Sequence, residues 1–371
     1  MTARFCPTSG PLETAIAALR RGLPVLLAGE GPNEPITEVV ISAAMAEPAS
    51  TTWAVRHSTG LLSAAMQSAW ADRLDIPPMM RLPDGASRTA SYGVSVDARD
   101  GVTTGISAVD RAHTARVLAD SASAPDDLTR PGHVLTYRAD EFGVLRRPLV
   151  AEAATDLCAI AGLPPVALTA SVVHDSGASM PAEAAADFAV REGIPLIHIT
   201  EIAHRRLYHD HPDGRVRPHD PRCRSTDGGL CMHEFTDGLT NARHAVLLTP
   251  SVRSGPVSVF VVRECPHGLL DPNCDCQENL RAHRLRAETT GGALVYLRQA
   301  VRGGGIHPDE TEYGSCVAML EALGIEEFDL VWPDTGLELP HCVSRLYQTS
   351  HRISARIVPP THSRSRHEAF L

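Results

Sequence analysis

The chain of 371 residues contains no lysine, so all 34 of its basic residues are arginine. This excludes chemistry that proceeds through a Schiff base on a lysine amine. Aromatic residues make up only 4% of the sequence, so alanine, valine, leucine and isoleucine must fill the core. No apolar run approaches the roughly 18 residues that a membrane span requires, and we expect no membrane partner.

The charge balance is acidic, with a formal net charge of -10. A nucleic-acid polymer is therefore not an expected partner, because binding its phosphates requires a basic surface. The N-terminal stretch MTARFCPTSG is too polar for a signal peptide, and nine cysteines, an odd number unevenly spread, do not suggest a disulfide framework. We therefore expect a cytoplasmic protein.

The length and patterning predict two domains of mixed helix and strand, that is, α+β or α/β. GLPVLLAG is typical of a buried strand, and SYGVSVDARDG alternates like a strand and ends in an Asp-Gly turn signal. SAVDRAHTARVLAD has helical spacing, with Ser107 as a candidate N-cap. These signals predict a first domain over residues 1–206.

The composition changes at YHDHPDGRVRPHDPRCRSTDGGLCMHEF, which is dense in His, Pro, Asp, Gly and Arg. We predict a linker over 207–235, because such residues favour turns and loops. Strand-like runs resume in HAVLLTP and GPVSVFVVREC, which predicts a smaller second domain over 236–360. The last residues, 361–371, are expected to be disordered.

The segment RECPHGLLDPNCDC carries three cysteines, Cys265, Cys274 and Cys276. Three thiolates close together suit a soft tetrahedral ion such as zinc. A fourth position held by water would favour hydrolysis, whereas His267 in that position would close the site and make it structural. Disulfide and redox chemistry remain alternatives.

A rival zinc set lies in the predicted linker: His219, Cys223, Cys231 and His233. Its spacing is loosely that of a zinc site, but the segment between the pairs is short and irregular. A solvated linker is the simpler interpretation.

Separate segments of the chain resemble two known families. ECPHGLLDPNCDC and, downstream, LVYLRQAVRGGGI resemble the zinc site and catalytic segment of GTP cyclohydrolase II. YGVSVDARDGVTTGISAVDRAHT and RPGHVLTYRA resemble 3,4-dihydroxy-2-butanone 4-phosphate synthase. Their order is that of the fused bifunctional riboflavin-biosynthesis enzyme. The resemblance implies a mixed-sheet synthase-like domain, a truncated cyclohydrolase-like domain and a homodimer.

The synthase family converts ribulose 5-phosphate to dihydroxybutanone phosphate and formate, and the resemblance implies a small phosphorylated substrate. In VTTGIS, a glycine-rich turn leads into a helix N-terminus, which is typical of an anion cradle. The candidate binding residues are Thr103, Thr104, Ser107, Arg111, Arg138, Arg147 and Glu152. His133 is the candidate catalytic residue of this half.

The metal-binding positions of that family are changed in this chain. The acidic loop becomes AGEGPNEPITE, which keeps Glu30, Glu34 and Glu38 among prolines. Val150 occupies the position of a family histidine, and Ser171 that of a family glutamate. Because magnesium binds through hard oxygen ligands, we do not expect this half to bind it as the family does.

In the cyclohydrolase half, the three cysteines occupy the family's zinc-ligand positions, but the loop between them is shorter. Arg302 and Asp309 are the candidate catalytic residues, whereas Thr311 stands where the family has its nucleophilic arginine. We therefore expect a divergent homologue whose family reactions are lost or altered. If active, it would be a lyase on a related sugar phosphate or a zinc-dependent nucleotide hydrolase. The alternative is a non-catalytic ligand-binding or regulatory protein of the riboflavin pathway.

Overall fold

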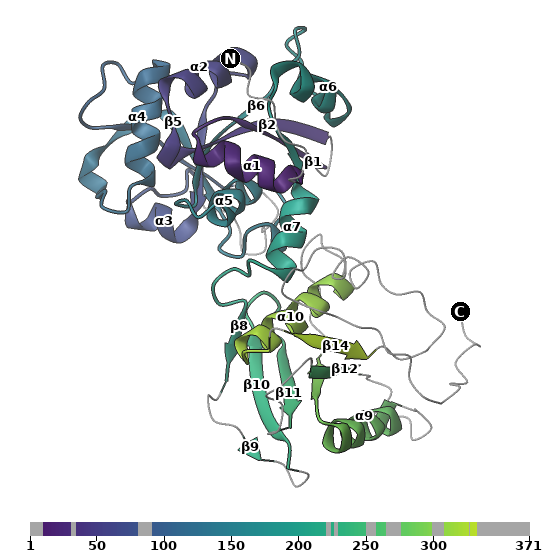
Figure 1. The fold of residues 1–371 in the computed structure, drawn as a ribbon. Coiled ribbons are helices and arrows are strands. Elements are labelled where there is room, and N and C mark those ends of the chain that lie inside the picture. Colours follow the sequence, from purple (N-terminus) through teal and green to yellow (C-terminus); the bar gives the residue numbers. More distant parts are fainter. Residues whose placement is uncertain are drawn as a thin grey trace. The chain divides into compact units, whose positions relative to one another are not determined.

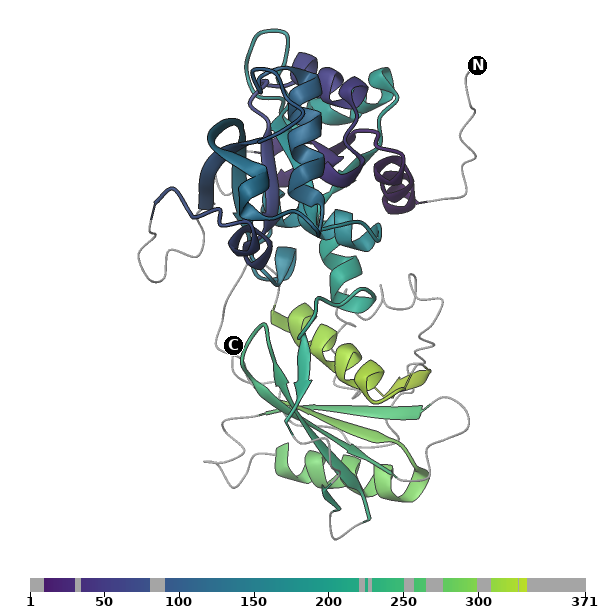
Figure 2. The ribbon, with the colours of Figure 1, turned by 90° about the vertical axis from the view of Figure 1, so that its left-hand side faces the viewer.

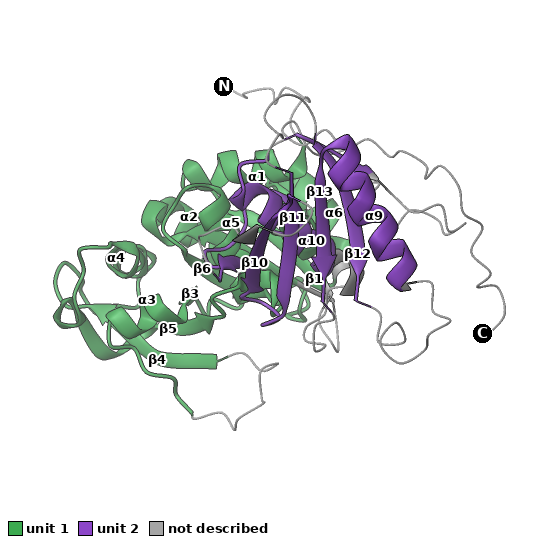
Figure 3. Ribbon diagram, turned by 90° about the horizontal axis from the view of Figure 1, so that it is seen from below, with its two compact units in different colours: residues 1–206 green, residues 207–371 purple. Residues whose placement is uncertain are grey.

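The computed structural model describes residues 10–30, 35–80, 91–219, 224–225, 229–249, 257–264, 276–298, 308–325 and 327–331. Its chain divides into two compact units, Met1–Arg206 and Leu207–Leu371 (Figure 3). No helix in these ranges is both long and apolar enough to cross a bilayer.

The first unit is built on a mixed sheet (Figure 1), in which the strands follow the order β4-β5-β3-β6-β2-β1-β7. The strands are β1 (Val25–Glu30), β2 (Pro35–Ser42), β3 (Ser63–Gln67), β4 (Ser91–Ala98), β5 (Leu128–Ala139), β6 (Val166–Ser171) and β7 (Leu196–His198). The helices are α1 (Pro11–Arg20), α2 (Pro48–His57), α3 (Ser68–Arg73), α4 (Ala108–Ala119), α5 (Val150–Ile160), α6 (Ala182–Glu192) and α7 (Ile199–Tyr208). Short 3-10 turns are η1 (Ala43–Met45), η2 (Pro125–Asp127) and η3 (Gly143–Leu145).

The main core of this unit lies where α2, α4 and α6 pack against the sheet. Val39 and Ile41 of β2 belong to it, because alternate residues of a strand point to the same face. A smaller cluster joins Ala65, Ala139 and Ala151, which brings the start of α5 against β3 and β5. Residues of β2 that alternate with Val39 therefore have a different environment from the main core.

The second unit contains a sheet with the order β14-β12-β13-β11-β10-β8, to which β9 adds by pairing with β10. Its strands are β8 (Val216–Pro218), β9 (Arg224–Ser225), β10 (Cys231–Asp237), β11 (Arg243–Leu248), β12 (Val257–Arg263), β13 (Ala293–Leu297) and β14 (Phe328–Val331). Its helices are α9 (Cys276–Thr290) and α10 (Pro308–Ala322), which lie on opposite faces of the sheet (Figure 2). The mixed fold class expected from the sequence is confirmed in both units.

The expected linker over 207–235 needs correction, because this segment contains β8, β9 and most of β10. These strands pair with one another at the edge of the second sheet. The composition suggested a loop because His, Pro, Asp and Gly favour turns, whereas strand formation depends on context as well as on composition. The expected disordered tail, 361–371, lies outside the described residues.

Candidate functional site

A pocket of about 180 Å³ lies beside β2, β3 and β6 of the first unit, where α5 begins. The described residues that line it are Glu38, Thr59, Leu61, Ser63, Tyr92, Tyr137, Val150, Ala151, Thr169, Ala170 and Ser171. Six of these carry a hydroxyl group and Glu38 carries a carboxyl group. The lining therefore offers many hydrogen-bonding groups and little charge.

Glu38 lies on β2 directly opposite Ser171 of the neighbouring strand β6. The Ser171 hydroxyl donates to Glu38 Oε1 over 3.4 Å. Burial raises the pKa of Glu38 to about 7, although hydrogen bonds from Ser171 and Thr169 act in the opposite direction. A carboxyl group in this condition can exchange a proton near neutral pH.

Tyr92 of β4 and Tyr137 of β5 face each other in adjacent strands. Their rings meet edge to face, with centroids 4.5 Å apart. Burial raises the pKa of Tyr137, and the nearby charges of Glu38 and Glu152 act in the same direction. Its hydroxyl therefore stays protonated and can donate a hydrogen bond.

Behind the pocket, Arg147 and Glu152 form a buried ion pair in which Arg147 Nε lies 2.6 Å from Glu152 Oε1. The same carboxylate accepts from the backbone N–H of Asp140 over 3.0 Å, and Arg147 Nη2 donates to the carbonyl of Arg138. Burial raises the pKa of Glu152 despite its partner. This pair fastens the start of α5 to β5.

The turn at Thr103, which we expected to bind an anion, instead donates hydrogen bonds to the carboxylate of Asp110. Asp110 accepts from the N–H and the hydroxyl of Thr103, at 3.1 and 2.7 Å, and from the N–H of Gly105 at 3.1 Å. The bonds from Thr103 are the main cause of the lowered pKa of Asp110. Ser107 caps α4 by accepting from the Asp110 N–H, and Thr104 is exposed.

Arg111, by contrast, has spare donor capacity. It is 5% exposed, and its Nη1 donates to the carbonyl of Gly60 over 2.7 Å. Its Nε has no hydrogen-bond partner in the described part of the chain, and burial lowers its pKa. Gly60 lies between the lining residues Thr59 and Leu61, although Arg111 itself does not line the pocket.

His133 is held by Asp97, which accepts from its backbone N–H at 2.9 Å and from Nδ1 at 2.7 Å. With its proton on Nδ1, the neutral imidazole has a lone pair on Nε2. The His133 side chain is 40% exposed. Arg138 bonds to neighbouring parts of the fold. It donates to the carbonyls of Ile76 and Ser68 and to the carboxylate of Asp72.

Most candidate residues of the second unit lie outside the described part of the chain. This holds for Cys265, Cys274 and Arg302, while Cys276 and Asp309 lie in the first turns of α9 and α10 with side chains that are not described. In the rival set, Cys231 is disulfide-bonded, so its thiolate is not a metal ligand. Among the described residues, no three His, Cys, Asp or Glu side chains form a metal site.

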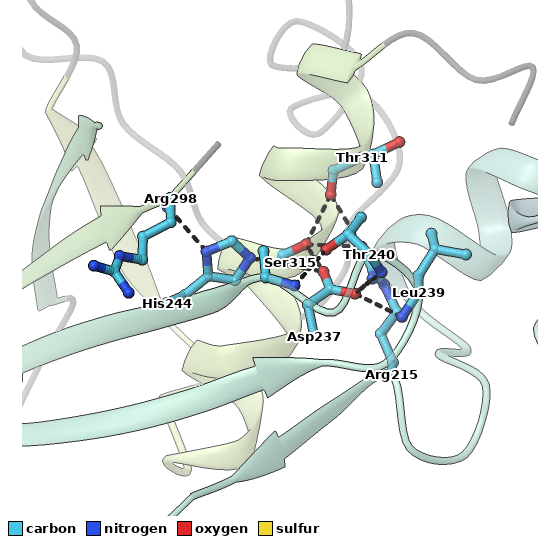
Figure 4. A network of polar contacts seen from close by, with 9 residues as sticks. Arg215, Asp237, Leu239, Thr240, His244, Arg298, Thr311 and Ser315 are labelled. Carbon is cyan, nitrogen blue, oxygen red and sulfur yellow. Dashed lines mark hydrogen bonds and ion pairs between the residues drawn. The ribbon is translucent and has the colours of Figure 1, made fainter. Parts of the chain in front are cut away.

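The second unit contains a buried polar network centred on Asp237 (Figure 4). Arg215 Nη1 donates to Asp237 Oδ1 over 2.5 Å, and the Ser315 hydroxyl donates to Oδ2 over 2.5 Å. His244 accepts from the N–H of Arg298 through Nδ1, so its Nε2 carries the proton that faces Asp237. Although burial would raise the pKa of Asp237, these partners lower it to about 2.

This network brings a serine, a histidine and an aspartate together, but it is not arranged for catalysis. Ser315, His244 and Asp237 are at most 2% exposed, so no substrate reaches them. Arg215 also donates to the carbonyl of Thr311 and to Ser315. The network therefore fastens α10 to β10 and β11.

The sequence did not identify Glu38 and Tyr137 as a pair, nor Asp97 as the partner of His133. The alternation in TEVVIS was the available signal for Glu38, since it places Glu38 on the face opposite Val39 and Ile41. Tyr137 and Asp97 gave no such local signal, because their partners come from other strands.

Comparison with known proteins identifies relatives over most of the chain. The 3,4-dihydroxy-2-butanone 4-phosphate synthase family matches residues 13–205. The riboflavin biosynthesis protein RibBA of Salinispora arenicola (strain CNS-205) is 36% identical over 296 residues, which cover 78% of this chain and 70% of that protein. RibBA of Nocardia farcinica (strain IFM 10152) is 35% identical over 294 residues, or 77% and 70%.

Two solved structures extend these matches. RibBX, a two domain 3,4-dihydroxy-2-butanone 4-phosphate synthase from A. baumannii, covers 94% of this chain and 99% of its own, with a TM-score of 0.66 at 23% identity. This likeness concerns the fold. A 3,4-dihydroxy-2-butanone 4-phosphate synthase in complex with two magnesium ions covers 53% of this chain and 97% of its own, with a TM-score of 0.50 at 30% identity.

Magnesium is a hard ion that prefers carboxylate and other oxygen ligands. Among the described residues of the pocket, Glu38 is the carboxylate, and Val150 offers no donor atom. Ser171 offers a hydroxyl, which already donates to Glu38. The described lining therefore does not fit a magnesium site built from several carboxylates.

Proposed function

Because the chain belongs to the 3,4-dihydroxy-2-butanone 4-phosphate synthase family, we propose that its first unit binds a small phosphorylated sugar in the pocket at Glu38. We further propose that the metal-dependent reaction of the family is lost or altered, and that the chain acts on a related sugar phosphate. The observation that carries this is the lining of the pocket, with six hydroxyl side chains around one carboxyl group.

The hydroxyl-rich lining suits a sugar, because each hydroxyl group of a sugar can both donate and accept a hydrogen bond. Thr59, Ser63 and Thr169 can each donate and accept. Because the pKa of Glu38 is raised to about 7, much of this carboxyl group is neutral near pH 7 and repels an anionic ligand less than a full charge would.

Two groups in or near the pocket support phosphate binding. Val150 and Ala151 line the pocket and belong to the first turn of α5, and a helix N-terminus attracts anions. Arg111 brings a buried guanidinium group to Gly60, and among the described residues its Nε has no hydrogen-bond partner. A buried cation without a counter-charge is costly, so an anion near it would stabilise the protein.

A non-catalytic, ligand-binding or regulatory role is the second candidate. It is favoured because two residues expected to contact the substrate bond to carboxylates of the protein itself. Thr103 donates to Asp110, and Arg147 donates to Glu152. In that case the pocket would bind the sugar phosphate without turnover.

For the second unit we propose a zinc site at Cys265, Cys274 and Cys276, in a domain that resembles GTP cyclohydrolase II. Three thiolates are the donor set that zinc prefers. Glu264, the residue before Cys265, directly follows β12, and Cys276 begins α9. Phe260 of β12 and Ala287 of α9 share a hydrophobic cluster, so the two elements that flank the cysteines in sequence pack together. Arg302 and Asp309 would contact a nucleotide at this site. We also propose that the chain forms a homodimer.

Zinc content tests this part directly. The full chain and the variants Cys265→Ser, Cys274→Ser and Cys276→Ser would be analysed for bound zinc after dialysis, with Cys158→Ala as a control because Cys158 is a buried free thiol of the first unit. We expect stoichiometric zinc in the unaltered chain and the control, and loss in the three serine variants. A zinc-free unaltered chain would remove the proposal.

Ligand binding tests the first unit. Ribulose 5-phosphate, ribulose and inorganic phosphate would each be titrated calorimetrically into the full chain in EDTA. We expect ribulose 5-phosphate to bind more tightly than either fragment, and Arg111→Gln to weaken it without affecting ribulose. Absence of binding at millimolar ligand would contradict the proposal.

A further inference from the structure

Resting on the proposed function, we propose that Glu38 transfers a proton between adjacent carbons of the bound sugar phosphate, with Tyr137 donating a hydrogen bond to the substrate oxygen and without a divalent metal ion. This inference names a reaction class for the pocket, the isomerisation or enolisation of a phosphorylated ketose or aldose.

The first support is the position of Glu38. Its side chain lines the pocket from a central strand, between β1 and β6, so its backbone is fixed by pairing on both sides. Ser171 donates to its Oε1, which orients the carboxyl group. A general base needs such a fixed position within reach of the proton that it removes.

The second support is the state of the neighbouring acids and bases. Glu152 is bonded to Arg147 and to the backbone of Asp140, and it does not line the pocket. Asp97 is bonded to His133. Among the described residues that line the pocket, Glu38 is therefore the group suited to take up a proton from carbon.

The third support is Tyr137, which lines the same pocket and interacts electrostatically with Glu38. Because burial keeps its hydroxyl protonated, Tyr137 can stabilise negative charge on a substrate oxygen. Without a metal ion, this hydrogen-bond donor would stabilise the negative charge that develops on the substrate oxygen.

The chemical step balances without any other reactant. The Glu38 carboxylate takes a proton from the carbon next to the carbonyl, and the C–H bonding pair becomes the C=C bond of an enediolate. The carbonyl electron pair moves to oxygen, where it accepts the hydrogen bond from Tyr137. Glu38, whose proton exchanges with solvent, then returns a proton to the same carbon, which exchanges the hydrogen at that carbon, or to the adjacent carbon. In the second case the hydroxyl proton on the first carbon passes to the enediolate oxygen, so that the carbonyl group moves to the first carbon and the isomerisation is complete.

Burial raises the pKa of Glu38 to about 7. This suits the role of general base, because a base works best when its pKa lies near the working pH. Once it has accepted the proton, Glu38 is neutral beside the anionic substrate, which limits repulsion between them.

The test is hydrogen exchange in D₂O with the full chain, ribulose 5-phosphate and excess EDTA, followed by NMR of the sugar. We expect deuterium at the carbons next to the carbonyl, with the rate lowered about 10² to 10⁴-fold in Glu38→Gln, which is the usual contribution of a general base. Tyr137→Phe should also lower the rate. Glu183→Gln is the matched control, because Glu183 is exposed on α6.

Binding of the same sugar, measured in parallel by calorimetry, separates the two proposals. Binding without exchange in the unaltered chain would overturn the role of Glu38 and leave sugar binding intact. Exchange that persists in Glu38→Gln, or that EDTA abolishes, would also overturn it. Absence of binding would remove the proposed function itself and this inference with it.

Discussion

The carboxylate of Asp97 holds His133 at two points, the backbone N–H at 2.9 Å and the ring nitrogen Nδ1 at 2.7 Å. Asp97 belongs to β4, and His133 belongs to β5, which pairs with it. The two bonds fix both the position of the imidazole and its tautomer. Gly105 packs against this pair, and its φ of +89° is one that glycine adopts most readily.

Gly105→Ala should therefore destabilise the first unit. A Cβ at this position would overlap the Asp97 carboxylate and lie 2.6 Å from His133 Nδ1. We expect a loss above ~1 kcal/mol in the free energy of unfolding, since the left-handed strain adds to the overlap. Gly177→Ala is the matched control, because Gly177 has a φ of +84° and nothing within 4 Å of an added Cβ. Equal losses in urea unfolding of the two variants would contradict the packing described for Gly105.

Asp237→Asn should destabilise the second unit more strongly. It leaves Arg215, which is 1% exposed at its side chain, without its counter-charge. Removing one partner of a buried ion pair costs about 3–5 kcal/mol. Hydrogen exchange of the β10 and α10 amides, read by mass spectrometry, would measure the change. Glu288→Gln, which breaks the more exposed pair with Arg284, should cost about 0.5 kcal/mol or less, and a similar loss in both variants would count against the network.

The stability of the first unit should depend on pH through Glu38. Its pKa is raised from 4.5 to about 7 on folding, so its contribution is fully present below pH 4.5 and is lost as the pH rises through 7. Glu38→Gln removes this dependence. We therefore expect Glu38→Gln to gain stability relative to the unaltered chain between pH 5 and pH 8, measured by urea unfolding of both. A difference that does not change with pH would show that the carboxyl group is not desolvated.

Restoring oxygen and nitrogen ligands to the pocket should create metal affinity. The double variant Val150→His and Ser171→Glu places an imidazole and a second carboxylate near Glu38, since both altered positions line the same pocket. Such a set suits a divalent ion. Titration with Mn²⁺, followed by electron paramagnetic resonance, should show tighter binding than in the unaltered chain. Unchanged affinity would contradict the account of the pocket as one with too few ligands.

Local signals in the sequence were sufficient for several elements. The alternation in SYGVSVDARDG predicted β4, and the position of Ser107 before a helical pattern predicted the N-cap of α4, whose side chain accepts from Asp110. Both signals act within a few residues, so no distant partner is needed to interpret them.

Contacts between distant residues could not be predicted in this way. Glu38 and Ser171 are 133 positions apart, and only the pairing of β2 with β6 brings them together. At shorter range, the turn at Thr103 was predicted to bind an anion because the spacing does not show that Asp110, seven positions later, accepts its hydrogen bonds. The segment at 207–235 was predicted to be a linker from its turn-favouring composition, yet β8 and β9 pair with β10.

The most direct test of the central claim is formate release from ribulose 5-phosphate by the full chain in excess magnesium, measured alongside calorimetric binding of the same sugar. The account predicts that the sugar binds and that formate stays at the level of the protein-free blank. Formate produced in step with consumption of the sugar would contradict it, because the pocket would then perform the family reaction with the residues it has.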